Sequence, residues 1–89
     1  MLEKILDNYY TKKLLNEIKW CLISGGLDYK FVFDDYGVEI KVKKKKYNKK
    51  QYKEIIYIEK NETLKYLCNI DGFIKQFTQK INYYMDNEE

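Results

Sequence analysis

The sequence predicts a small α+β domain in which a helix, a three-stranded antiparallel meander and a long helix follow one another, with both helices on one face of the sheet. Three observations predict this fold: apolar stripes of helical spacing at both ends, apolar–polar alternation in the middle, and a length of 89 residues. A chain of this length has room for one hydrophobic core, so residues 1–89 are expected to form a single domain. The hydrophobic fraction of 45% is typical of globular proteins.

Residues 2–23 are expected to form the first helix. They contain no proline, and the two glycines that follow Ser24 supply a stop, because glycine readily takes the left-handed conformation beyond a helix end. One face of this helix is expected to contact the sheet. It carries Leu14, Leu15, Ile18, Cys21 and Leu22.

A second apolar stripe lies on the opposite face of the first helix. It consists of Leu2, Ile5, Leu6, Tyr9 and Trp20. Either the helix breaks near Thr11 or one straight helix buries different faces at its two ends, and we prefer the straight helix. The stripe is a candidate protein interface, which the end of the second helix, a second copy of the chain in a homodimer, or a functional partner would cover. Packing against the second helix ranks first of these three.

Two strands joined by a short turn are expected over residues 27–33 and 38–43, where apolar and polar residues alternate. In the turn, Asp34 is expected to bond to its own backbone and Gly37 to take a positive φ. This turn predicts a register in which six side chains face the core. The pairs are Phe33 with Val38, Phe31 with Ile40, and Tyr29 with Val42. A third strand is expected over residues 51–59, where consecutive apolar residues leave its inward face undecided.

The second helix is expected over residues 62–85, with Asn61 as its N-cap and no break at Gly72. Its apolar stripe keeps one phase and comprises Leu67, Ile70, Ile74, Phe77, Ile81 and Met85. At 1.5 Å per residue this helix would be roughly 36 Å long, so it would overhang a strand of about 23 Å. Tyr83 is expected to be half-buried packing.

The strongest functional signal is a lysine-rich segment, residues 41–53, which we call the lysine hairpin. It contains eight lysines and no acid, whereas the rest of the chain has nine lysines and fourteen acids. Phosphate is the partner that most simply relieves such crowding, and tyrosines among the lysines can stack on bases. The candidate binding residues are Lys41, Lys43, Lys44, Lys45, Lys46, Tyr47, Lys49, Lys50, Tyr52 and Lys53. A hairpin that is only solubilising explains the same pattern about equally well.

The leading expectation for function is therefore non-catalytic binding of nucleic acid or of a nucleoprotein complex. The chain contains no alanine, proline, arginine or histidine, a composition that favours an AT-rich genome, such as that of a low-GC bacterium or its phage. Without arginine, sequence-specific reading of guanine is not expected. The second expectation is a phage anti-defence inhibitor of the anti-CRISPR type, which occludes a host machine by protein–protein contact.

The predicted element order is similar to that of the double-stranded-RNA-binding domain. That family carries a lysine-rich KKxAK segment at the start of its second helix. The corresponding residues 61–67, NETLKYL, contain one lysine and one acid. The resemblance covers connectivity and no motif, so membership of that family is not inferred.

One catalytic pattern has a partial counterpart here. Glu39 and Lys41, preceded by Asp28 or Asp34, are similar to the D…ExK pattern of PD-(D/E)XK nucleases. The predicted register leaves Asp28 about 13 Å along its strand from the position opposite Glu39. A solvent-facing charge pair is the preferred interpretation, so no enzyme activity, catalytic residue, metal or cofactor is expected.

The two cysteines, Cys21 and Cys68, are expected to be free thiols in a reducing cytoplasm. The N-terminal residues carry acids and lack the apolar core of a secretory signal. No apolar run approaches the ~18 residues of a membrane span, so no membrane partner is expected.

Overall fold

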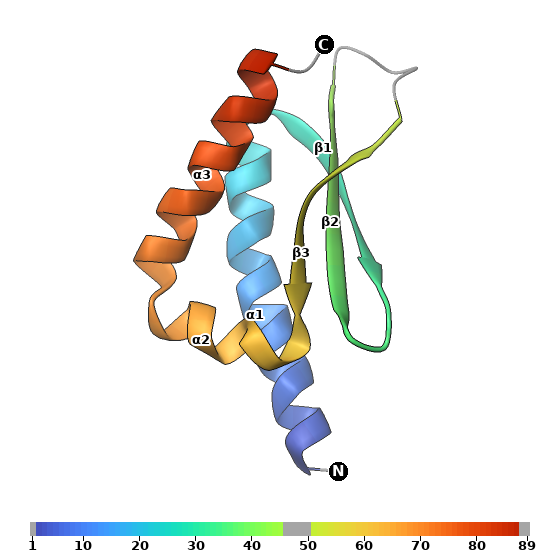
Figure 1. The fold of residues 1–89 in the computed structure, drawn as a ribbon, viewed down its shortest axis with the longest axis vertical. Helices are drawn as coiled ribbons and strands as arrows, with labels where there is room; N and C mark the ends of the chain where they lie inside the picture. The colour runs from blue at the N-terminus through green and yellow to red at the C-terminus, as the bar shows by residue number, and fades with distance from the viewer. Residues whose placement is uncertain (1, 46–50, 88–89) are drawn as a thin grey trace.

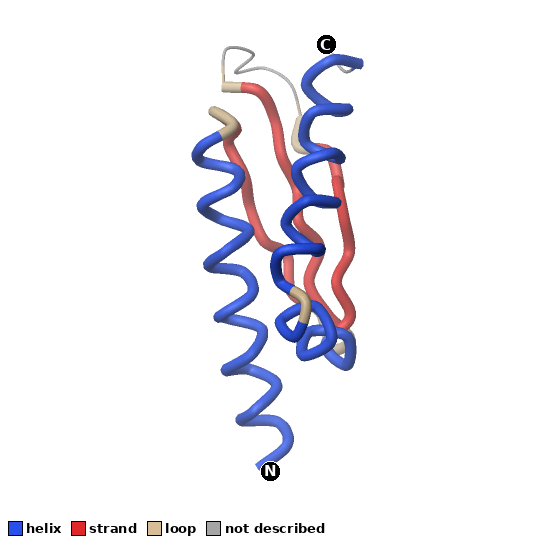
Figure 2. Tube along the Cα trace, turned by 90° about the vertical axis from the view of Figure 1, so that its left-hand side faces the viewer, coloured by secondary structure: helices blue, strands red, loops and turns tan. Residues whose placement is uncertain are grey.

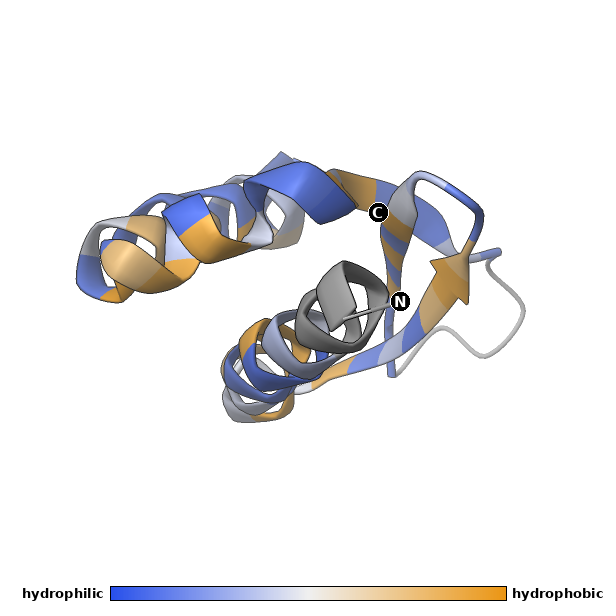
Figure 3. Ribbon diagram, turned by 90° about the horizontal axis from the view of Figure 1, so that it is seen from below, coloured by the Kyte–Doolittle hydropathy of each residue, from blue (hydrophilic) through white to orange (hydrophobic). Residues whose placement is uncertain are grey.

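The structure, a computed structural model, describes residues 2–45 and 51–87, with side chains from Tyr9 onward. The elements are α1 (Leu2–Ser24), β1 (Leu27–Phe33), β2 (Gly37–Lys44), β3 (Lys53–Glu59), the 3-10 turn η1 (Lys60–Glu62), α2 (Thr63–Cys68) and α3 (Ile70–Asn87). The strands form an antiparallel sheet in the order β1-β2-β3, and the helices lie on one face of it (Figures 1 and 3). The predicted α+β fold is confirmed.

Helix α1 is continuous through Thr11, as preferred from the sequence. Its predicted sheet-facing side chains are buried, with Ile18 and Leu22 fully inaccessible and Cys21 partly covered. Past the helix end, Gly26 has a φ of 72°, the left-handed value expected for a glycine stop. In Figure 2 the N-terminal end of α1 extends beyond the sheet.

The register between β1 and β2 is the predicted one, with Phe33 opposite Val38 and Phe31 opposite Ile40. The β2 residues of these pairs are fully buried. Phe33, however, is 61% exposed, so the prediction that all six side chains enter the core is wrong. Phe33 lies at the end of an edge strand, where it lines an open pocket with Thr11 and Lys12 of α1. The helix therefore does not close over this end of the sheet.

In the turn between β1 and β2 the predicted hydrogen bonds to Asp34 are present, but glycine is required at position 37 for a reason other than the predicted one. The Asp34 carboxylate accepts the backbone N–H of Tyr36 at 2.7 Å and that of Gly37 at 2.8 Å. Gly37 does not have a positive φ, contrary to the prediction. Its backbone packs so closely on β3 that a Cβ would clash with the carbonyl oxygen of Ile58. Close approach of two strands therefore requires this glycine.

A hydrogen bond from β3 fastens the sheet to the same turn. The Tyr57 hydroxyl donates to both carboxylate oxygens of Asp34, at 2.8 and 3.0 Å. The pKa of Asp34 is lowered, first by the N–H of Tyr36 and then by this hydroxyl. Partial desolvation, followed by the bond to Asp34, raises the pKa of Tyr57 to about 12.

The raised pKa predicts that this contact weakens in alkali. Between the unfolded value of about 10 and the folded value, an unfolded Tyr57 loses its proton while a folded one keeps it. The unfolded state then binds fewer protons, so the free energy of unfolding falls as pH rises through this window. Below the window the contribution of Tyr57 to stability is fully present and does not depend on pH. Urea unfolding of the parent and Tyr57→Phe at pH values from about 8 to 11 tests this. We expect the parent to lose more stability than Tyr57→Phe; parallel curves would contradict the assignment.

Strand β3 begins at Lys53, two residues later than the prediction, and contains an irregularity that explains its continuous apolar run. Ile56 pairs with Ile40 and Ile58 with Val38, whereas Lys41 pairs with Glu54, so the register shifts at Ile55. A bulge puts two successive residues on one side of a strand. Ile55 and Ile56 are accordingly both partly buried against the core, while Ile58 is fully buried.

The long second helix predicted over residues 62–85 is broken, which corrects the prediction. Asn69, with φ −134° and ψ 57°, separates α2 from α3, and Asn61 lies in η1 and caps no helix. The break lets α2 pack on α1 before α3 turns back along it (Figure 1). Gly72 makes room for the Asn69 side chain, whose amide nitrogen lies 2.6 Å from where a Cβ would stand.

The break also rotates the buried face of α3. Phe77 and Ile81 are buried as predicted, but their neighbours on the buried face are Phe73 and Tyr84. Leu67, Ile70 and Ile74 are only partly buried. Met85, predicted to end the stripe, is 39% exposed. Because α3 begins separately at Ile70, its rotation about its own axis is independent of α2. In one continuous helix over residues 62–85, the rotation of the first turns would fix that of the last.

Candidate functional site

The β1–β2 turn and the described residues of the lysine hairpin lie at different ends of the sheet in a molecule whose long axis measures 43 Å. In an antiparallel meander the β1–β2 turn lies at the opposite end of the strands from the end of β2 and the start of β3, as Figure 1 shows. The first end carries the acids Asp34, Asp35, Glu59 and Glu62 together with Lys60, while the described residues of the lysine hairpin lie at or near the second. The β1–β2 turn with its two aspartates and the described part of the lysine hairpin therefore lie at opposite ends of the sheet.

The structure describes part of the lysine hairpin. Lys46, Tyr47, Lys49 and Lys50 lie outside the described residues. Lys41, Lys43 and Lys44 belong to β2, Lys45 follows β2, Tyr52 precedes β3, and Lys53 begins β3. All of these described residues therefore lie at or near the hairpin end of two paired strands.

Tyr52, predicted to stack on bases, is already in contact with two cations. The ammonium of Lys30 lies 4.9 Å from its ring centroid, and that of Lys43 lies 5.0 Å from it. Both distances are typical of cation–π contacts. This ring therefore holds lysines from β1 and β2 together on the sheet.

Lys44 attaches the hairpin to the end of α3. Its Nζ donates to the backbone carbonyl oxygen of Met85 at 3.0 Å and lies 5.8 Å from the ring centroid of Tyr84. Carbonyl groups at a helix C-terminus are unsatisfied and carry partial negative charge, which a lysine stabilises. Lys44 thus has a structural contact that its place in a lysine run did not reveal.

Lys41 and Lys43 of β2 have acidic neighbours in the sheet, whereas the sequence of the connection between β2 and β3 contains no acid. Lys43 pairs in register with Asp28 and Lys41 with Glu54, and Lys41 also lies 3.8 Å from Glu39. Residues 45–50 contain no acid. Of these residues the structure describes Lys45, which is exposed.

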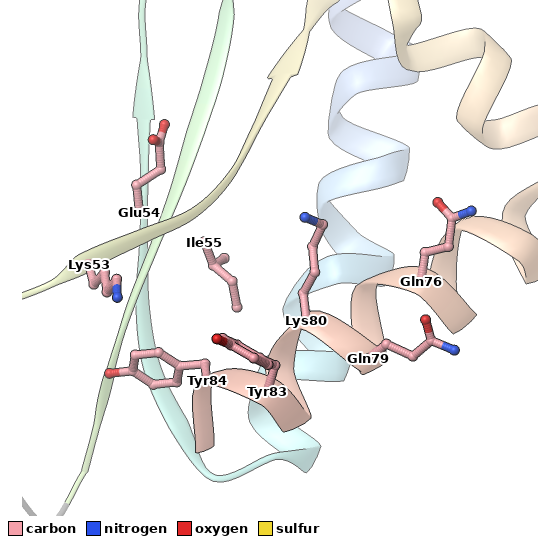
Figure 4. A pocket seen from close by; sticks show the side chains of 8 residues that line it. All are labelled: Lys53, Glu54, Ile55, Gln76, Gln79, Lys80, Tyr83 and Tyr84. Carbon is pink, nitrogen blue, oxygen red and sulfur yellow. The ribbon is translucent and has the colours of Figure 1, made fainter. Parts of the chain in front are cut away.

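A groove opens next to the lysine hairpin, between α3 and β3 (Figure 4). Its volume is about 650 Å³, and its lining consists of Lys53, Glu54, Ile55, Gln76, Gln79, Lys80, Tyr83 and Tyr84. Tyr83 is 68% exposed, so the prediction that it is half-buried packing is wrong.

Sequence reasoning missed this groove. A signal was present, because positions 76, 79, 80 and 83 share one face of a helix through spacings of three, four and seven. That polar face lies beside the buried apolar one. Which face of α3 lines the groove depends on the break at Asn69 and on the resulting rotation of α3, so it could be known only from the structure.

The candidate interface on α1 is exposed where its side chains are described. Tyr9 is 59% and Trp20 56% exposed, so the preferred prediction, that the second helix covers this stripe, is wrong for both. The side chains of Leu2, Ile5 and Leu6 lie outside the described residues. Trp20 borders a pocket of about 410 Å³ between α1 and α3, whose apolar lining comes mainly from Ile74 and Ile81.

The nuclease-like carboxylates do not form a cluster. Glu39 is near Lys41, and the Asp34 carboxylate accepts bonds from two backbone groups and from Tyr57. Across residues 9–45 and 51–87, no three His, Cys, Asp or Glu side chains are placed to hold a metal ion. Cys21 and Cys68 are free, and burial, followed by the charge of Glu17, raises the pKa of the Cys21 thiol.

Within the part of the chain that the structure describes, no helix has the length and apolar character needed to cross a membrane. Comparisons of this chain with known protein families, with curated proteins and with solved structures find no match.

Proposed function

We propose that this protein binds nucleic acid, alone or in a nucleoprotein complex, through the lysine hairpin and without catalysis. The observation that supports this is the lysine hairpin itself, which has eight lysines and no acid over residues 41–53 and whose described residues lie at or near one end of the sheet. Neutralising phosphates releases their counterions, which favours binding at such a site.

The anchored base of the hairpin supports the same proposal. Lys43 is held over Tyr52, and Lys44 is bonded to the end of α3. These contacts attach the described base of the hairpin to both the sheet and α3. Binding through lysine alone is expected to be insensitive to sequence, because ammonium groups lack the forked geometry that reads guanine.

A quadruple variant in the connection tests the proposal. Replacing Lys45, Lys46, Lys49 and Lys50 with glutamine avoids the structural contacts of Lys43 and Lys44. We expect weaker binding to unrelated sequences alike, and a shallower dependence of affinity on salt by about 0.9 per lost phosphate contact on duplex DNA. Fluorescence anisotropy of labelled duplex and single strands over a range of salt concentrations measures both quantities.

A matched control removes the same charge elsewhere. Lys12, Lys13, Lys65 and Lys75 are exposed and lie on the helices. Their quadruple glutamine variant is expected to retain nearly all of the parent's affinity and salt slope. Equal losses in the two variants would contradict a localised site, and a parent protein without low-salt affinity for DNA or RNA would contradict the proposal itself.

A second candidate function is inhibition of a host machine by protein contact, as in phage anti-defence proteins. Two observations favour it: the exposed Trp20 beside an apolar pocket, and a composition typical of an AT-rich phage or host genome. Tryptophan is enriched at the energetic centres of protein interfaces. Capture from a nuclease-treated lysate of a low-GC host, with parent and Trp20→Lys proteins in parallel, tests it. A host protein that the parent retains and the variant loses is the expected result.

A further inference from the structure

We propose that the groove between α3 and β3 holds an unpaired nucleotide, so that the protein binds single-stranded nucleic acid in preference to duplex. This inference rests on the proposed nucleic-acid binding and names its substrate class. Its basis is the chemistry of the groove lining and the position of the groove beside the lysine hairpin.

The groove and the hairpin share a residue. Lys53 ends the lysine hairpin and also lines the groove, and Tyr84 links them again because Lys44 lies against its ring. In Figure 4, Lys53 and Tyr84 lie at one end of the groove, and Lys80 and the two glutamines at the other. A strand whose phosphates contact the hairpin therefore has a continuous path into the groove.

The lining offers each interaction that an unpaired nucleotide requires. Tyr83, 68% exposed, presents an aromatic face on which a base can stack. Lys80 supplies positive charge for a phosphate from the helix side of the groove. Gln76 and Gln79 carry amide groups that both donate and accept, and the Glu54 carboxylate accepts from a base amino group.

The recess favours a single strand for a geometric reason. In a duplex every internal base is stacked on both faces, so it cannot offer a face to Tyr83 unless it is first extruded. The groove lies between a helix and a strand of the same molecule, and its volume of about 650 Å³ is in the range of small-ligand sites. An unpaired nucleotide enters such a recess without the cost of unstacking a pair.

Tyr83 variants test the stacking contact directly. The probes are a labelled oligothymidylate of about 15 nucleotides and a blunt duplex of the same length. Tyr83→Leu is expected to weaken single-strand binding about ten-fold or more and to leave duplex binding unchanged, because only the stacked base is lost. Tyr83→Phe keeps the aromatic face and is expected to bind like the parent.

The controls use the same changes outside the groove. Tyr36, 79% exposed, lies in the acidic turn at the far end of the molecule, so Tyr36→Leu is expected to bind like the parent. Lys80→Gln is expected to weaken single-strand binding, whereas Lys75→Gln, on the same helix but outside the groove, is expected to have less effect.

Photocrosslinking locates the contact independently of affinity. A single strand containing 5-iodouridine is expected to crosslink to the tryptic peptide that begins at Ile81 and contains Tyr83. Two results would overturn the groove inference and leave the proposed function standing. In the first, Tyr83→Leu binds the single strand like the parent while the hairpin variant loses binding. In the second, the crosslink lies on another peptide. If the parent binds neither probe at low salt, both are overturned.

Discussion

Phe77→Ala is expected to lower the free energy of unfolding by about 3–5 kcal/mol, the usual cost of removing a buried phenylalanine. Phe77 is 1% exposed and belongs to the same core cluster as Ile40 and Ile18, so its removal leaves a cavity among elements of both layers. It also stacks on Phe73 with ring centroids 6.0 Å apart. Small domains have about 5 kcal/mol or little more to lose, so the variant is expected to be close to unfolding. Urea unfolding followed by far-UV circular dichroism measures the change.

Phe33→Ala is the matched control for this experiment. Phe33 is 61% exposed at the end of β1, so the same substitution is expected to cost less than about 1 kcal/mol. A Phe77→Ala protein that melts within a few degrees of the parent would show that the buried face of α3 is wrongly assigned.

Gly37→Ala is expected to destabilise the protein by about 1–3 kcal/mol or more, as other forced overpacking does. The added Cβ would clash with the carbonyl oxygen of Ile58 and stand 3.0 Å from Cα of Glu59. Both are backbone atoms of the paired strand β3, so they can move only if the two strands separate. Thermal and urea unfolding measure the effect.

Two comparisons distinguish this steric cause from a conformational one. Gly25→Ala places its Cβ in ordinary van der Waals contact, no closer than 3.5 Å, and is expected to be nearly neutral. Asparagine tolerates positive φ better than alanine, so it should relieve Gly26, whose φ is 72°, but not Gly37. A Gly37→Asn protein clearly more stable than Gly37→Ala would contradict the clash.

The candidate site was partly predictable from residue order. Eight lysines without an acid identify the lysine hairpin from the sequence alone, because the distribution of charged residues along a chain does not depend on its fold. The structural contact of Lys44 could not be read in the same way, since its acceptor is a backbone carbonyl 41 residues away in the sequence. The groove was missed for a related reason: Tyr83 and Lys80 meet Lys53 only across the space between two elements.

Local patterns by themselves determined the element order and the pairing of β1 with β2. The alternation of apolar and polar residues specifies which residues of each strand face inward. With a four-residue turn, only one register places the inward residues of β1 opposite those of β2. The end of α1 was likewise determined locally, by the freedom of Gly26 to take a φ of 72°.

Only the tertiary structure decided how well each inward position is covered and where the last helix breaks. Phe33 is on the inward side of its strand, yet it is exposed because α1 leaves an open pocket between Thr11, Lys12 and Phe33 at this end of the sheet. The position of a neighbouring element cannot be derived from the local sequence pattern. The break at Asn69 lets α2 and α3 run in different directions while both contact α1, which one straight helix cannot do. Packing between elements, summed over many contacts, outweighs the small preference of residues 62–85 to continue as one helix.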